Sequence, residues 1–171
     1  MSVVAARVYN DRIEVAADTI CIRGGDKLKD AEKSHTKLFR HKDLVVGGVG
    51  ISSEIGLIQR YMKSHIIKEM TEDCIFDFFV EFSKWKNDLT SDKDIENSYL
   101  LASQGKCFYV NKHFVCRITD FHAIGAGDDY AKGAMYMGAS PREAVKAACD
   151  LCIYVSEPIL LETIPITSNF S

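Results

Sequence analysis

Ser2 is the residue whose type and position point most directly to chemistry. It follows the initiating methionine, and a small second residue normally permits removal of Met1, so the mature chain is expected to begin with a serine. A serine hydroxyl is a weak nucleophile until a base takes its proton. The α-amino group on the same Cα, with an ordinary pKa of about 8, is suited to that role. The sequence therefore predicts a nucleophile that carries its own base.

The elements that must position this serine are two strands of a predicted hairpin. Residues 1–7 and 13–18 are rich in Val, Ile and Ala, and the Tyr-Asn-Asp-Arg segment at 9–12 between them has the chemistry of a turn. A hairpin that begins at the first residue places the N-terminus inside a sheet, whereas most chain ends fray. Ser2 is thus expected at a fixed position.

Length, charge and cysteine content set the broad class. We interpret the 171 residues as one domain, 1–171. A net charge of −3 gives no reason to expect nucleic acid or an anionic membrane as a partner, and no apolar run has the length of a membrane span. The N-terminus lacks the features of a signal peptide, and the six cysteines lack the spacing of a disulfide scaffold. We therefore expect reduced thiols and a cytoplasmic location.

Strands and helices are predicted in separate blocks. Helices are expected after Ser52 or Ser53, after Thr71, after the Gly-Ala-Gly segment at 125–127, and after the Ser140 cap with its Pro-Arg-Glu continuation. Beyond the first hairpin, strands are expected at 19–22, 37–40, 44–47, 99–102, 107–110, 114–117, 121–124 and 159–164. This order predicts an α+β fold in which helix pairs cover a sheet sandwich.

Two helices have a clear predicted core face. The apolar face of the first is expected to consist of Ile55, Ile58, Met62 and Ile66. Aromatic residues dominate the face of the second, and we interpret that stripe as core packing. Its members are Ile75, Phe78, Phe79, Phe82 and Trp85.

Five segments, in the same order and with near-identical spacing, resemble one family. Ser2 and Asp18 are separated by sixteen positions, as are the N-terminal nucleophile and the aspartate of that family. The other matching segments are Thr-Lys-Leu-Phe-Arg at 36–40, the glycine turn at 47–50, Ala-Ile-Gly-Ala-Gly at 123–127 with Tyr-Ala at 130–131, and Ala-Cys-Asp-Leu-Cys-Ile-Tyr at 148–154. The chain thereby resembles proteasome β-type subunits, above all the HslV (ClpQ) peptidase, among the N-terminal-nucleophile (Ntn) hydrolases. The resemblance covers nearly the whole chain and implies a four-layer αββα sandwich of two mostly antiparallel sheets.

The resemblance also implies roles for individual residues. Lys37 is expected beside Ser2 as a cation that disfavours protonation of the α-amine, and Asp18 is expected to hold Lys37 in place. Gly47 matches the glycine whose backbone N–H stabilises the oxyanion. A peptide substrate is expected to lie extended along this strand edge. Cys21, Val45 and Val49 are expected to line the pocket for its first side chain, which would favour apolar substrates, and Gly48 is expected to bind the substrate as well.

Several positions leave a second interpretation open. Lys33 competes with Lys37, because it lies nearer to the family's count from Asp18. Asp18 also fits the plain end of a strand, and Lys37 fits a solvated strand lysine. The Cys149–Cys152 pair has the spacing of a redox or zinc motif, but its mid-helix position without a second pair favours buried small hydrophobes.

No cofactor is expected for the chemistry itself. The resemblance implies one structural cation, sodium or magnesium, bound by the backbone carbonyls of Cys149, Cys152 and Val155.

The function predicted from these residues is that of a self-compartmentalising peptidase. It would act as a ring of identical subunits, stacked hexamers or heptamers, supplied with polypeptide by an AAA+ ATPase. Two departures from the family pattern weaken the catalytic prediction: serine replaces threonine as nucleophile, and Ala126 replaces a serine between two glycines. A non-catalytic ring subunit and a small-molecule amidase of the Ntn class are therefore the alternatives.

Overall fold

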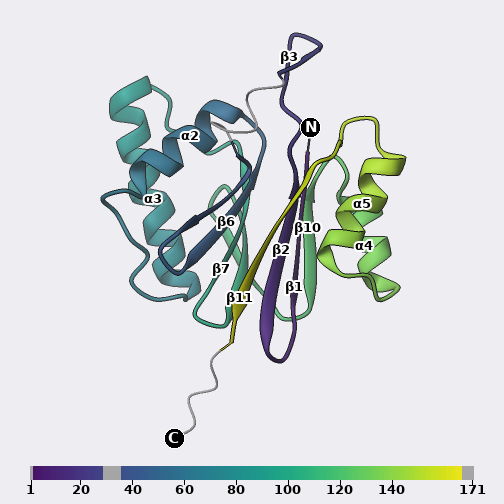
Figure 1. The fold of residues 1–171 in the computed structure, drawn as a ribbon. Helices are drawn as coiled ribbons and strands as arrows, with labels where there is room; N and C mark the ends of the chain where they lie inside the picture. The colour runs from purple at the N-terminus through teal and green to yellow at the C-terminus, as the bar shows by residue number, and fades with distance from the viewer. Residues whose placement is uncertain (1, 29–35, 167–171) are drawn as a thin grey trace, which may run out of the picture.

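Two facing β-sheets form the centre of the molecule, and a pair of helices covers the outer face of each (Figure 1). The computed structural model describes residues 2–28 and 36–166. Both central sheets are antiparallel throughout. The predicted αββα sandwich is thus confirmed. Within the described ranges, no helix is long and apolar enough to cross a membrane.

The first sheet contains the N-terminal hairpin at its centre. Its strand order is β10-β1-β2-β11. Small and β-branched residues fill β1 and β2, and most of them are fully buried because the sheet is covered on both faces. The four strands are β1 (Val3–Val8), β2 (Arg12–Asp18), β10 (Phe121–Gly125) and β11 (Ile159–Pro165).

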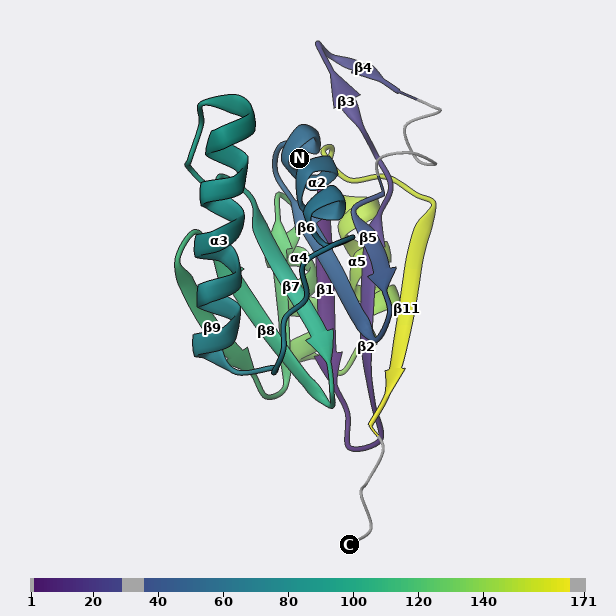
Figure 2. The same ribbon diagram turned by 90° about the vertical axis from the view of Figure 1, so that its left-hand side faces the viewer.

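The second sheet runs in simple sequence order, β5-β6-β7-β8-β9. Short turns join most of its neighbours, as expected for antiparallel strands. Its strands are β5 (Leu38–His41), β6 (Leu44–Val49), β7 (Ser98–Ser103), β8 (Lys106–Asn111) and β9 (Phe114–Ile118). A separate two-stranded ribbon, β3 (Ile22–Arg23) with β4 (Asp26–Lys27), projects beyond the end of the sandwich that carries the N-terminus (Figures 1 and 2).

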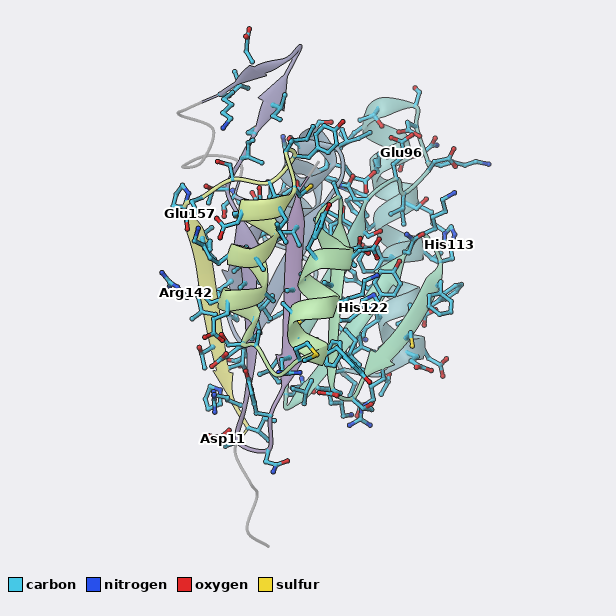
Figure 3. The ribbon with its side chains drawn as sticks, turned by 90° about the vertical axis from the view of Figure 1, so that its right-hand side faces the viewer. Asp11, Glu96, His113, His122, Arg142 and Glu157 are labelled. Atoms are coloured by element: carbon cyan, nitrogen blue, oxygen red, sulfur yellow. The ribbon has the colours of Figure 1, made fainter. Side chains whose placement is uncertain are left out.

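The helix pairs differ in the side chains that they bury. Helices α2 (Ser52–Tyr61) and α3 (Glu72–Thr90) cover the second sheet (Figure 2), and the predicted aromatic stripe of α3 packs there. Helices α4 (Asp128–Tyr136) and α5 (Pro141–Leu151) cover the first sheet (Figure 3), mainly through alanines such as Ala131, Ala144 and Ala148. Small side chains let this helix pair approach the hairpin that carries Ser2 closely.

The helix ends confirm some predictions and correct others. The Thr71 cap and the Ser140–Glu143 capping box are both present. The predicted Ser52 or Ser53 cap is wrong, because the N-cap of α2 is Ile51, which offers no side-chain oxygen. The assignment of Ile66 to the apolar face of that helix is also wrong. The helix ends at Tyr61, and Ile66 is 59% exposed.

Candidate active site

Ser2 lies at the start of β1, enclosed by the loop that follows β10. It is only 3% exposed. Its carbonyl accepts a hydrogen bond from the N–H of Gly127 at 3.2 Å. Gly125, at φ +103°, passes so close that a Cβ there would lie 2.3 Å from the same carbonyl oxygen. The glycines of this segment therefore let the chain wrap around Ser2. Met1 lies outside the described residues, so its removal stays a prediction.

Asp18 and Lys37 form a buried ion pair next to Ser2. The Lys37 ammonium donates to both carboxylate oxygens of Asp18, at 2.9 and 2.8 Å. Asp18 ends β2 and is fully buried, while Lys37 directly precedes β5 and is 8% exposed. The carboxylate also accepts the N–H of Val3 at 2.9 Å and that of Ile20 at 3.2 Å. These four contacts satisfy both oxygens of a group that is costly to bury.

The surroundings of Lys37 make its ammonium easier to deprotonate than that of an exposed lysine. Burial lowers the pKa of Lys37 from its ordinary value, and the attraction of Asp18 opposes this without cancelling it. Lys37 is thus a cation near Ser2 that is held in one position by Asp18 and has little contact with solvent.

A pocket of about 120 Å³ opens beside Ser2. Three residues predicted for the site, Ser2, Cys21 and Lys37, line it together, and Asp18 is linked to it through Lys37. The remaining wall consists of Ile20, Ile22, Gly50, Ser52 and Ile55, and most of the surface that lines the pocket is polar.

The structure places the other predicted residues away from that wall. Gly47 faces the opposite sheet, where a Cβ would lie 2.5 Å from the Val4 Cγ1 atom, so its missing side chain serves the packing between the sheets. Val45 belongs to the same inter-sheet core and is fully buried, which corrects its expected place along the substrate. The Gly48 N–H donates to the Lys37 carbonyl at 2.8 Å. Val49 is 7% exposed and stands next to Gly125.

The glycine that lines the pocket is Gly50, which sequence reasoning missed. It follows β6 directly and has φ +130°, a conformation that side chains disfavour. A Cβ here would lie 2.1 Å from the Asn97 Oδ1 atom. The only sequence signal was a run with three glycines in four positions, and nothing in that run tells which glycine faces the pocket.

The C-x-x-C pair at the end of α5 contacts the loop that encloses Ser2. Cys152 donates its S–H to the Ala126 carbonyl at 3.5 Å, and burial raises the pKa of Cys149 to about 11. All six cysteines are unbridged. Among the described residues, no group of three or more His, Cys, Asp or Glu side chains could hold a metal. Cys152 belongs to the core between the helices and the first sheet, with Cys149 packed against it, so the pair packs as small hydrophobes. The mid-helix position expected for the pair is wrong, because α5 ends at Leu151 and Cys152 is its C-cap.

The backbone at the end of α5 is compatible with the predicted cation. The Cys152 carbonyl accepts the Val155 N–H at 3.2 Å, which leaves its second lone pair for another partner. The C-terminal end of a helix also carries partial negative charge. Binding of a small cation by the carbonyls of Cys149, Cys152 and Val155 stays a prediction.

Comparisons with known proteins agree on the fold. No protein-family model and no curated protein sequence matches the chain. Among solved structures, BPH from Thiobacillus denitrificans in complex with epoxomicin superposes with a TM-score of 0.87 at 23% identity, over 97% of this chain and 100% of that chain. A second structure of BPH gives a TM-score of 0.85 at 25% identity, over 96% and 98% of the two chains.

A third structure with the same fold is a eukaryotic HslV. HslV from Trypanosoma brucei superposes with a TM-score of 0.72 at 21% identity, over 95% of this chain and 99% of that chain. The match extends over nearly all of both proteins, which agrees with the strand and helix order described above. The chain therefore has the fold of the proteasome β-type, HslV-like Ntn hydrolases, as its sequence motifs predicted.

Proposed function

We propose that this chain is a subunit of a peptidase whose nucleophile is Ser2, exposed as the N-terminal residue by removal of Met1. The observation that carries the proposal is the pocket that Ser2 shares with Lys37, whose ammonium is held in place by the buried carboxylate of Asp18. This arrangement matches what an N-terminal nucleophile requires: a hydroxyl, an adjacent amine and a nearby cation that favours the neutral amine.

The reaction proceeds through an acyl-enzyme. The α-amine of Ser2 takes the hydroxyl proton while Oγ forms a bond to the substrate carbonyl carbon. The tetrahedral intermediate then expels the leaving amine, which receives that proton, and an ester to Ser2 remains. Water, deprotonated by the same α-amine, attacks the ester. The second tetrahedral intermediate breaks its bond to Ser2 Oγ, which takes the proton back from the α-amine as the carboxylic acid product leaves. Lys37 changes no bond in these steps and acts through its charge.

The oxyanion of the intermediate needs a backbone donor, and we assign that role to Gly50 in place of Gly47. Gly50 lines the pocket, whereas Gly47 faces the core between the sheets. Glycine is required at this position by the positive φ and by the contact with Asn97, which leaves no room for a Cβ. One donor of this kind typically contributes about 2.7–4 kcal/mol to the transition state.

The substrate is a polypeptide with a small side chain at the cleavage site. The pocket is small, and Ile20, Ile22 and Ile55 line part of it beside the polar groups of Ser2, Lys37 and Ser52. The fold is shared with HslV and with BPH, and BPH was crystallised with epoxomicin, a peptide that carries an epoxyketone. An inhibitor of that class reports on peptide binding as well as on the nucleophile.

The active form is a homo-oligomeric ring that receives substrate from an AAA+ ATPase. Strongly exposed apolar side chains support an assembly: Tyr136, Met137 and Ile153 are 80%, 82% and 84% exposed at the ends of α4 and α5. Sedimentation velocity tests this part. A species of ring size supports it, and a monomer at every concentration contradicts it.

A non-catalytic ring subunit is the second candidate, and Ala126 is the observation that favours it. This residue stands between the two glycines that enclose Ser2, where it supplies no hydroxyl to relay a proton. Water would have to take over that step in an active enzyme.

Intact mass before and after incubation with epoxomicin decides between the two candidates. The epoxyketone closes a ring across the hydroxyl and the amine of one residue, so an adduct requires both groups. We expect a chain without Met1 that gains one inhibitor, no adduct for Ser2→Ala, and a normal adduct for the control Ser53→Ala. Retained Met1, or no adduct on the processed chain, favours the non-catalytic subunit.

A further inference from the structure

A second buried ion pair, Glu54 with Lys86, lies between α2 and α3, away from Ser2. The Lys86 ammonium donates to Glu54 at 3.0 Å, and Lys86 and Glu54 are 4% and 2% exposed. Among ion pairs in the described part of the chain, only this pair and Asp18–Lys37 bury both side chains. Burying two charges is costly, so a pair of this kind is weak evidence for stability alone. Its other contacts indicate what it does.

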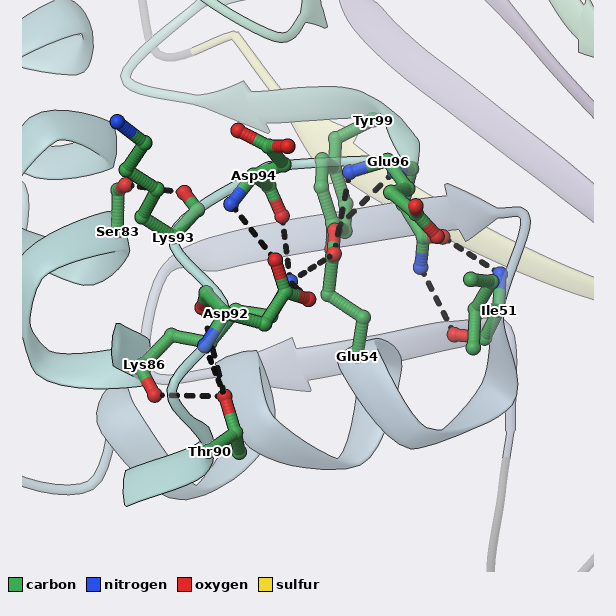
Figure 4. A network of polar contacts seen from close by, with 11 residues as sticks. Ile51, Glu54, Ser83, Lys86, Thr90, Asp92, Lys93, Asp94, Glu96 and Tyr99 are labelled. Carbon is green, nitrogen blue, oxygen red and sulfur yellow. Dashed lines mark hydrogen bonds and ion pairs between the residues drawn. The ribbon is translucent and has the colours of Figure 1, made fainter. Parts of the chain in front are cut away.

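The Glu54 carboxylate organises the backbone that leads into β7 (Figure 4). One oxygen accepts the N–H of Asn97 at 3.1 Å and the hydroxyl of Tyr99 at 3.0 Å. The other accepts the N–H of Glu96 at 3.1 Å as well as the Lys86 ammonium. With four donors around it, this carboxylate fixes the position of the backbone at 96–97.

Lys86 anchors the same loop from the side of α3. Its ammonium also donates to the Asp94 carbonyl at 2.5 Å and pairs with the Asp92 carboxylate at 2.9 Å. These contacts raise the pKa of Lys86 despite its burial. The lysine therefore keeps its charge and ties the loop between α3 and β7 to the Glu54 carboxylate.

Asn97 connects the loop before β7 to the backbone that lines the pocket. Its side chain makes two hydrogen bonds to one residue: Oδ1 accepts the Ile51 N–H at 2.5 Å, and Nδ2 donates to the Ile51 carbonyl at 3.0 Å. Asn97 is 1% exposed, and Ile51 is the N-cap of α2 that lacks a side-chain cap of its own. The neighbouring Gly50 packs directly on the Asn97 Oδ1 atom and lines the Ser2 pocket.

We infer that Asn97, held by the Glu54–Lys86 pair, is a positioning residue that fixes the backbone of Gly50 beside Ser2. The inference rests on the proposed function, in which the Gly50 N–H meets the oxyanion. Such a donor is effective only when it is already in place as charge develops, and a displacement of about 1 Å is enough to cost roughly a hundredfold in rate. The glycine itself, at φ +130°, has no side chain to hold it.

The test substitution is Asn97→Asp, which keeps the size of the side chain. One carboxylate oxygen still accepts the Ile51 N–H, but the other replaces a donor and faces the Ile51 carbonyl. The matched control is Asn111→Asp, because Asn111 donates through Nδ2 to Ser98 Oγ at 2.8 Å in the same sheet and does not line the pocket. Glu54→Gln is the second variant, since Lys86 there keeps Asp92 as its counter-charge.

The readout is the rate at which epoxomicin inactivates the protein, followed by intact mass at several inhibitor concentrations. Two quantities are obtained: the maximal rate of inactivation and the inhibitor concentration that gives half of it. We expect Asn97→Asp to lower the maximal rate about tenfold to a hundredfold with little change in the half-saturating concentration. Glu54→Gln should give a smaller decrease in the same parameter, and Asn111→Asp none. A general loss of stability would not be confined to the maximal rate.

Hydrogen exchange of residues 49–53, followed by mass spectrometry, measures how well this backbone segment is ordered and does not require an active enzyme. Faster exchange of this segment in Asn97→Asp than in Asn111→Asp supports the inference. Equal exchange, or a wild-type maximal rate in Asn97→Asp, overturns it. If the wild-type protein forms no adduct, the proposed function fails, and the exchange experiment still decides whether Asn97 orders the Gly50 segment.

Discussion

The Lys37 ammonium lies within 2.9 Å of both carboxylate oxygens of Asp18, and this contact joins the two sheets at the end that carries Ser2. Asp18 belongs to the first sheet, and Lys37 directly precedes the first strand of the second. The ion pair therefore does two things at once. It holds a cation near the nucleophile, and it closes the sandwich at the point where the pocket opens.

Loss of the Asp18 carboxylate should destabilise the fold strongly. Asp18→Ala leaves the buried Lys37 ammonium without a counter-charge and removes the acceptor of the Val3 and Ile20 N–H groups. Removing one partner of a buried pair typically costs about 3–5 kcal/mol. Urea denaturation measures the change in the free energy of unfolding. The exposed pair Glu81–Lys84 provides the control, since Glu81→Ala should cost at most about 0.5 kcal/mol.

Gly47 and Gly56 should respond to alanine with opposite signs. A Cβ at Gly47 meets Val4 at 2.5 Å inside the inter-sheet core, and overpacking of this kind costs about 1–3 kcal/mol. A Cβ at Gly56, in α2, meets nothing within 4 Å, so Gly56→Ala should stabilise by about 0.5–1 kcal/mol. Thermal or urea unfolding distinguishes the two.

The contact with Val4 can be tested separately by a double-mutant cycle. If the methyl group introduced by Gly47→Ala clashes with Val4, then Val4→Ala should cost less in the Gly47→Ala background than in the wild type. Additive effects would contradict a direct contact and leave Gly47 without a packing role.

The sequence was sufficient to predict the features that depend on local pattern. The N-terminal hairpin follows from two β-branched runs around a turn, and the Ser140 capping box follows from residues three positions apart. Both depend on neighbours in the chain. The approach of Lys37 to Asp18 needed the family resemblance, because nineteen positions separate the two and Lys33 was a competitor by spacing. Lys33 lies outside the described residues.

What sequence reasoning missed depends on contacts between distant segments. The α2 helix was predicted to begin at a serine cap, yet Asn97, forty-six positions away, holds the Ile51 backbone instead. The assignment of the pocket glycine failed for a related reason. Gly47 lies within β6 and packs against Val4, whereas Gly50 follows the strand and packs against Asn97. Which of the two glycines lines the pocket therefore depends on contacts with distant segments.

The thiols should differ sharply in reactivity in the folded protein. Cys107 is fully buried, which raises its pKa to about 12, and a thiol reacts as its thiolate. Cys116 is exposed. Iodoacetamide at a pH of about 8, followed by peptide mass spectrometry, should label Cys116 in the native protein and Cys107 only after denaturation. Equal labelling of both in native conditions would mean that β8 is not packed as described.

The pH dependence of the reaction with epoxomicin should show the lowered pKa of Lys37. The rate rises as the α-amine of Ser2 loses its proton, and it falls again once Lys37 loses the positive charge that stabilises the negative charge developing on the Ser2 Oγ atom. Because burial lowers the pKa of Lys37, this alkaline decrease should begin below the ordinary lysine value of 10.5. Lys37→Arg keeps its charge over the whole range, so in that variant the decrease should move to higher pH even if the rate is lower. The control is Lys84→Arg, at an exposed position, which should leave the profile unchanged. An identical alkaline limb in the wild type and Lys37→Arg would assign that limb to another group and remove the argument for Lys37 as the cation beside Ser2.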